Sequence, residues 1–125
     1  MLKKWGRATF LRRMPFLVER GGPAESRRVF FKKISSFLPE EDPRYKEIER
    51  AYDCAETALE GKFREGGERS FSHSRAVALI MIACSRVRDH RLIIAGLLHD
   101  TVEDCPDWTV ELVEQKFGAY VALLI

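Results

Sequence analysis

The chain has 125 residues, of which 46% are hydrophobic and 32% are charged, a balance typical of one folded domain rather than a disordered or fibrous protein. No apolar stretch reaches the roughly 18 residues that a membrane-spanning helix needs, so we expect no contact with a membrane. The three cysteines lack zinc-finger or CxxC spacing and are odd in number, which argues against a disulfide framework and favours a cytoplasmic location.

Charge is distributed unevenly along the chain. Residues 1–33 carry ten lysines and arginines against two glutamates, whereas residues 34–125 carry eleven against seventeen acidic residues. We therefore expect residues 1–28 to form a basic N-terminal tail or lead-in, followed by a domain over residues 29–125. Such a tail could contact nucleic acid or anionic lipid, and its start also has the composition of a transit peptide. Most basic tails are only solvated, so we do not expect nucleic acid as a partner.

Two helices are predicted at the start of the domain. Phe30, Ile34 and Leu38 recur at helical spacing and define the first. Asp42 is expected to cap the second helix, with Pro43 at its first position, because both residue types favour a helix start. The hydrophobic side chains of the second helix are expected to form one core-facing stripe of Ile48, Tyr52, Ala55, Leu59 and Phe63.

A charged loop is predicted from Gly61 to Ser72. Arg64 and Arg69 lie in it, and their guanidinium groups could hold a phosphate or stack on a base. Gly66 and Gly67 would let the backbone approach a ligand closely. The alternative is an ordinary connector, since glycine pairs are common in charged loops.

His73 begins a strongly apolar segment, which predicts a third helix running on to about Cys84. A histidine at the start of a helix is commonly a surface or capping residue. It becomes a candidate metal ligand when a second histidine and an adjacent aspartate lie elsewhere in the same domain, as His99 and Asp100 do here.

The segment from Arg91 to Asp104 is predicted to be a helix whose apolar first half crosses the core. Its second half turns acidic. His99 lies four residues before Glu103, and Asp100 lies three residues before Glu103, so these side chains share one face. Like charges at this spacing repel by roughly 0.2–0.5 kcal/mol per pair. A divalent cation would turn that repulsion into attraction, although a solvated acidic helix end remains the alternative.

The adjacent His99 and Asp100 are too few to hold an ion, and His73 is the obvious third ligand. Mixed imidazole and carboxylate ligands suit manganese, iron(II), zinc or magnesium, and two histidines argue against a site made of oxygen ligands alone. We expect Mn²⁺. Glu103 and Asp104 are placed to handle the proton of a metal-bound water that attacks a phosphate ester.

The last predicted helix runs from Val110 to Phe117, with Gly118 closing it. Residues 119–125 are almost entirely apolar and would need a partner, so self-association through this end is possible on sequence grounds. No strand pattern is visible. The fold class expected from these elements is all-α.

The stretch from about Tyr45 to Ile125 resembles the hydrolase domain of the RelA/SpoT-type guanosine tetra- and pentaphosphate enzymes, a branch of the HD-domain phosphohydrolases. The resemblance rests on the nine-residue step from Arg64 to His73 and on the HDxxED string from His99 to Asp104, both more specific than a bare His-Asp pair. It implies an HD-domain helical bundle and a manganese-dependent 3′-pyrophosphohydrolase that releases pyrophosphate from the stringent-response alarmone.

The resemblance also implies roles for individual residues. His73, His99 and Asp100 would be metal ligands, and Glu103 and Asp104 would assist the attacking water. Three further residues would contact the nucleotide: Arg64, which would pack against the guanine base, Gly66 and Arg69.

Departures from the family pattern accompany these matches. Arg69, Ser70 and Ser74 stand where many members have proline, tyrosine and proline. A fourth metal ligand would come from a helix beyond Ile125, so residues 29–125 are expected to be a partial HD hydrolase domain that lacks the C-terminal helices. The alternative function is therefore a catalytically impaired fragment that acts as a nucleotide-binding, metal-binding or regulatory module.

Overall fold

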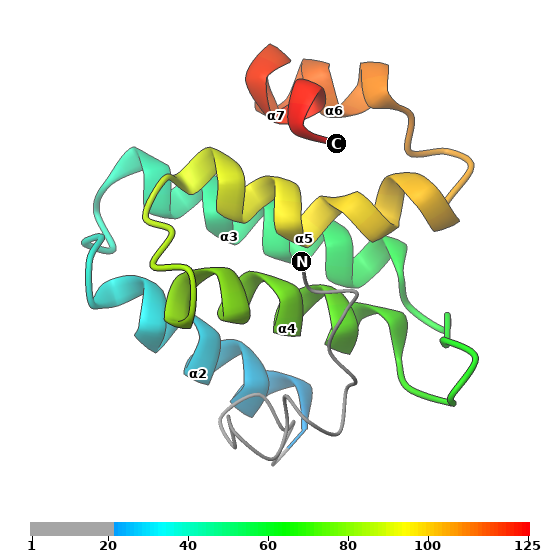
Figure 1. Cartoon of the computed structure of the whole chain (residues 1–125), viewed down its shortest axis with the longest axis horizontal. Helices are drawn as coiled ribbons and strands as arrows, with labels where there is room; N and C mark the ends of the chain where they lie inside the picture. The colour runs from blue at the N-terminus through cyan, green and yellow to red at the C-terminus, as the bar shows by residue number, and fades with distance from the viewer. Residues whose placement is uncertain (1–21) are drawn as a thin grey trace.

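The computed structural model describes residues 22–125, and the expectations for residues 1–21 lie outside this part of the chain. The described residues form six helices, which are α2 (Pro23–Ser35), α3 (Pro43–Ala58), α4 (Ser70–Ala83), α5 (His90–Asp104), α6 (Val110–Phe117) and α7 (Ala119–Leu124). Pairing of extended backbone in residues 22–125 is limited to one isolated bridge between Phe63 and Arg69. The all-α prediction is confirmed (Figure 1).

Helix α2 begins inside the segment that the charge pattern assigned to a basic tail. Pro23 occupies its first turn after Gly22, so residues 23–28 are helical. Arg27 joins α2 to α3, because its Nε donates a hydrogen bond to Asp53 Oδ1 over 3.2 Å. The predicted border between residues 28 and 29 therefore lies within α2.

Local capping explains where several helices start. The Asp42 carboxylate accepts a hydrogen bond from the Arg44 backbone N–H at 2.8 Å, and Pro43 takes the first helical position, as predicted. Thr109 caps α6 in the same way through the N–H of Leu112. Helix α6 then ends at Gly118, where the sequence pattern placed its stop.

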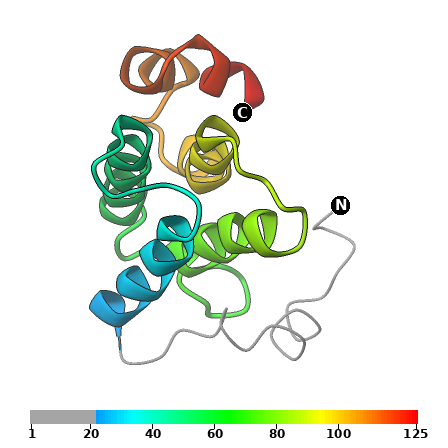
Figure 2. The same cartoon turned by 90° about the vertical axis from the view of Figure 1, so that its left-hand side faces the viewer.

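The helices stack in three layers. Helices α6 and α7 form the upper layer in Figure 1, α3 and α5 the middle layer, and α4 and α2 the lower layer, and the turned view in Figure 2 agrees. Helix α5 packs against α3, α4 and α7, so it lies at the centre of the molecule. None of the helices in residues 22–125 has the length and apolar composition that crossing a bilayer requires.

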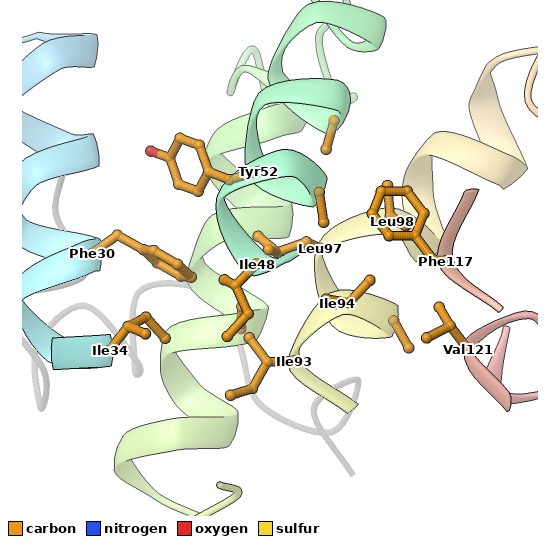
Figure 3. Packing of buried hydrophobic residues seen from close by; sticks show 14 of the residues in the cluster. Phe30, Ile34, Ile48, Tyr52, Ile93, Ile94, Leu97, Leu98, Phe117 and Val121 are labelled. Atoms are coloured by element: carbon orange, nitrogen blue, oxygen red, sulfur yellow. The ribbon is translucent and has the colours of Figure 1, made fainter. Parts of the chain in front are cut away.

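The core is built around the first half of α5, as its apolar sequence predicts. Ile93, Ile94, Leu97 and Leu98 are fully buried. Figure 3 shows them between the side chains of α2 and α3 on one side and those of α6 and α7 on the other. The middle layer is therefore buried on both faces.

One predicted core residue lies outside the core. Phe63 was expected to continue the stripe of α3, but 63% of its surface is exposed. Helix α3 ends at Ala58 and the stripe ends at Leu59, which is buried. Gly61 then adopts a φ of +77° that breaks the helical periodicity, so the residues beyond it no longer face the core.

Candidate metal centre

Two helices bring the candidate ligands together. The last turns of α5 carry His99, Asp100 and Glu103, each with one potential ligand atom within 4.8 Å of the others. His73 lies in the first turn of α4, which packs alongside α5. Its Nε2 is 3.7 Å from Oδ2 of Asp100. The predicted place of His99 in a helix is confirmed, whereas the helix that His73 was expected to begin starts three residues earlier, at Ser70.

Asp100 lies at the centre of this group and is only 4% exposed. Its Oδ1 is 3.2 Å from Nε2 of His99. Its Oδ2 accepts a hydrogen bond from the hydroxyl of Ser74 at 3.2 Å and lies 3.6 Å from Nη1 of Arg64. A buried carboxylate is costly unless donors or cations surround it, and here they come from the loop, from α4 and from α5 itself.

The loop before α4 is a short hairpin, closed by the isolated bridge between Phe63 and Arg69. The Arg64 N–H donates to the Glu68 carbonyl at 2.7 Å, and the Gly67 N–H donates back to the Arg64 carbonyl at 2.9 Å. Gly67 has a φ of +85°, a conformation that side-chain-bearing residues rarely adopt. The tight turn sets the position of Arg64, whose guanidinium reaches Asp100.

The remaining predicted site residues lie in the hairpin loop, at the start of α4 and at the end of α5. Gly66 is exposed in the turn that follows Arg64, and Arg69 is partly buried at the N-cap position of α4. Asp104 is exposed in the last turn of α5, outside the group of three ligand atoms. Glu103, which was predicted to act on the proton, belongs to that group.

The residue types fit a divalent metal ion. Imidazole nitrogens and carboxylate oxygens are the donors that manganese, iron(II) and zinc share, and the buried Asp100 carries a charge that an ion would neutralise. Candidate ligands are the predicted His73, His99 and Asp100, together with Glu103.

A comparison with known protein families identifies the family of the part of the chain that carries the candidate ligands. Residues 51–125 match the model of the HD domain family. The chain belongs to this family.

The relatives of this HD domain are much longer proteins. This chain is 39% identical over 92 residues to the bifunctional (p)ppGpp synthase/hydrolase SpoT of Escherichia coli K12, and the match covers 74% of this chain and 12% of that protein. It is 42% identical over 79 residues to the guanosine-3′,5′-bis(diphosphate) 3′-pyrophosphohydrolase of Aquifex aeolicus, and this match covers 63% of this chain and 11% of that protein. A GTP pyrophosphokinase of Streptomyces coelicolor is 39% identical over 80 residues, covering 64% and 9%. The chain thus spans about an eighth or less of the length of these relatives.

Sequence reasoning missed one contact in the centre of the HD domain. Ser74 was noted only as a departure from the family pattern, but its hydroxyl lies against Asp100. A signal was present, because a serine next to His73 on a helix predicted to pack beside α5 is close to the same aspartate. The side on which Ser74 faces could not be read without the register between the two helices.

Proposed function

We propose that this HD domain is a divalent-metal-dependent hydrolase that releases pyrophosphate from the 3′ position of a guanosine alarmone. The observation that carries the proposal is the buried Asp100 with two histidines, Glu103 and an arginine gathered around it. The reaction is the one named for relatives 39–42% identical to this chain.

His73, His99 and Asp100 are the proposed metal ligands, and Mn²⁺ is the proposed ion. Asp100 supplies the charge, and the two imidazoles supply neutral nitrogen donors from neighbouring helices. Such an ion lowers the pKa of a bound water and neutralises charge that develops on a phosphate oxygen.

Glu103 and Asp104 are the proposed proton-handling residues. The carboxylate of Glu103 lies beside the ligand atoms of His99 and Asp100, where it can accept a proton from an attacking water. Asp104 follows on the exposed side of the same helix end. It is proposed to assist Glu103 by orienting that water.

Arg64, Gly66 and Arg69 are the proposed substrate contacts. The side chain of Arg64 is 41% exposed, so part of it is accessible to a ligand while Nη1 lies near Asp100. A planar cation can stack on a guanine base. Gly66 offers backbone in the exposed turn, and Arg69 offers a second cation for phosphate at the start of α4.

Two further parts of the proposal concern surroundings. We propose a cytoplasmic location, supported by three cysteines that all lie in the described residues and form no disulfide. Self-association through the C-terminal end stays a prediction, supported by Leu123 of α7, which is 81% exposed.

The test is pyrophosphate release from guanosine tetraphosphate in the presence of Mn²⁺. Wild type is compared with Asp100→Asn, which keeps the side-chain shape but removes the charge. Asp107→Asn is the matched control, because Asp107 is exposed after α5 and lies outside the ligand group. We expect release from wild type and the control, and loss in Asp100→Asn.

A folded, metal-loaded wild type that releases no pyrophosphate would contradict the hydrolase proposal. The same protein binding the nucleotide without turnover would instead favour the nucleotide-binding or regulatory module. Binding is measured by calorimetry with guanosine tetraphosphate, using Arg64→Gln as the variant expected to weaken it.

A further inference from the structure

Ser74 connects the two helices of the candidate metal centre. It lies on α4, directly after His73, and is fully buried. Its hydroxyl donates a hydrogen bond of 3.2 Å to Oδ2 of Asp100 on α5. Both ends of this hydrogen bond are therefore shielded from water.

Ser74 differs from the other groups near Oδ2 of Asp100. The closest approaches of Arg64 and His73 to this oxygen are 3.6 and 3.7 Å, beyond ordinary hydrogen-bond distance. The Arg64 side chain is also long and 41% exposed, so holding it in one place costs conformational entropy. Serine has a single side-chain torsion before its hydroxyl, so its hydrogen bond is made at little entropic cost.

The contact restricts how the carboxylate of Asp100 can rotate. One oxygen, Oδ1, lies 3.2 Å from Nε2 of His99, and the other accepts the hydrogen bond of Ser74. Turning the carboxylate out of this plane would break the contact with the buried hydroxyl. The hydrogen bond thus holds the plane of the carboxylate, with one oxygen beside Ser74 and the other beside His99.

We propose that Ser74 is a positioning residue of the metal centre, whose hydroxyl fixes the orientation in which Asp100 offers its carboxylate to a divalent cation. This inference rests on the metal centre of the proposed function. Hydrogen-bond partners of metal ligands commonly change metal affinity or activity by about 10–100-fold when they are removed.

A purely structural role makes a different prediction. If Ser74 only satisfies a polar atom between helices, its loss lowers the stability of the fold and leaves the metal affinity of the folded protein unchanged. If it orients Asp100, its loss weakens metal binding even where the protein is fully folded. Metal affinity at a temperature far below unfolding separates the two roles.

The experiment is calorimetric titration of Mn²⁺ into wild type and Ser74→Ala, with circular dichroism to verify folding. We expect the affinity to fall by about ten-fold in Ser74→Ala. Ser26→Ala is the control. Ser26 is a buried serine on α2 with no hydrogen-bond partner for its hydroxyl among residues 22–125, so its variant should bind Mn²⁺ like wild type.

Threonine and valine at residue 74 give a second comparison, because they have the same shape and differ in the hydroxyl. Ser74→Thr should bind Mn²⁺ more tightly than Ser74→Val. This comparison does not depend on whether Ser74→Ala folds. With saturating Mn²⁺ and with guanosine tetraphosphate varied as the substrate, loss of the hydroxyl should lower kcat. It should leave KM nearly unchanged, because Ser74 is fully buried and does not face the substrate.

The outcomes separate this inference from the proposed function. Equal Mn²⁺ affinity in wild type and Ser74→Ala would overturn the role of Ser74, whether or not the protein hydrolyses the alarmone. Weakened binding in Ser74→Ala without any hydrolysis by wild type would support Ser74 and overturn the hydrolase. A wild type that binds no Mn²⁺ would overturn both.

Discussion

The two ends of α5 carry the same kinds of side chains in different surroundings. Its start has an aspartate followed by a histidine, Asp89 and His90, and its end has a histidine followed by an aspartate, His99 and Asp100. Among the described residues, only the second pair belongs to a group with metal-ligand spacing. Residue type alone therefore does not distinguish the two ends.

Asp89 is satisfied by its own neighbours in sequence. It accepts a hydrogen bond from the Arg91 backbone N–H at 2.9 Å and another from the Arg91 guanidinium at 2.9 Å. These hydrogen bonds, that of the side chain first, lower the pKa of Asp89 to about 2. This carboxylate caps the helix and has no need of an ion.

Apart from its neighbour His99, Asp100 is satisfied by groups that are distant in the sequence. Its partners Arg64 and Ser74 come from the hairpin and from α4, and its side chain is 6% exposed against 31% for Asp89. The difference teaches that burial, together with donors drawn from several elements, separates a candidate site from a helix cap. Four changes test that distinction.

The largest expected effect on stability comes from a substitution between the two ends of α5. Leu97 is fully buried in α5, and Leu97→Ala should lower the free energy of unfolding by about 2–5 kcal/mol through lost burial and a cavity. Urea denaturation measures it. If the site depends on the packing of α4 and α5 rather than on the cap, Mn²⁺ affinity should fall as well. Destabilisation below about 1 kcal/mol would show that this position repacks easily.

Exchanging the two histidines for alanine compares the ends directly. His99→Ala should weaken Mn²⁺ binding by at least about 100-fold, the upper end of what loss of an outer partner causes. His90→Ala should leave it unchanged, because His90 lies near Glu47 and Asp89, outside the ligand group. Calorimetry measures both affinities. Equal losses in the two variants would remove the distinction between the ends.

Asp89→Ala should damage the cap and spare the site. Loss of a capping side chain costs about 0.5–2 kcal/mol, and the free energy of unfolding in urea should fall by that amount. Asp89→Asn is the control, since asparagine also caps helices well. A loss of Mn²⁺ affinity in Asp89→Ala would show that the two ends are coupled.

The smallest expected effect is a change with pH at the cap. The pKa of Asp89 falls from 3.8 to about 2 on folding, so the charged carboxylate stabilises the fold above pH 3.8, and this stabilisation is lost as the pH falls toward 2. The difference in unfolding free energy between wild type and Asp89→Ala should therefore shrink across this window. Urea titrations at pH 5 and at about pH 2.5 measure it. A constant difference would mean that the charge of Asp89 contributes nothing.

Features that depend on neighbours in sequence were predictable. The cap of α3 at Asp42 and Pro43, the stop of α6 at Gly118, and the apolar half of α5 all follow from local preferences or periodicity. The start of α5 was placed at Arg91, two residues after its cap at Asp89. Its end at Asp104 was correct.

Features that depend on tertiary packing were harder to predict. Helix α7 was read only as an apolar end in need of a partner, and α5 proves to be one of its partners, with Val121 buried. Phe63 was assigned to the core because the period of α3 was continued past its end. The nearness of His73 and Asp100 was predictable from two apolar helices in one small domain. The hydrogen bond of Ser74 required their register.

The interface between α4 and α5, called the seam below, is tightly packed at Gly96. A Cβ atom placed there would lie 2.7 Å from Sδ of Met81, so the methionine thioether rests almost on the backbone of α5. Asp100 follows Gly96 by one helical turn, and Ser74 faces it from across the seam. The absence of a side chain at Gly96 therefore determines how closely α4 and α5 can approach each other. A residue too large for Met81 to accommodate would wedge the helices apart and lengthen the reach from α4 to Asp100.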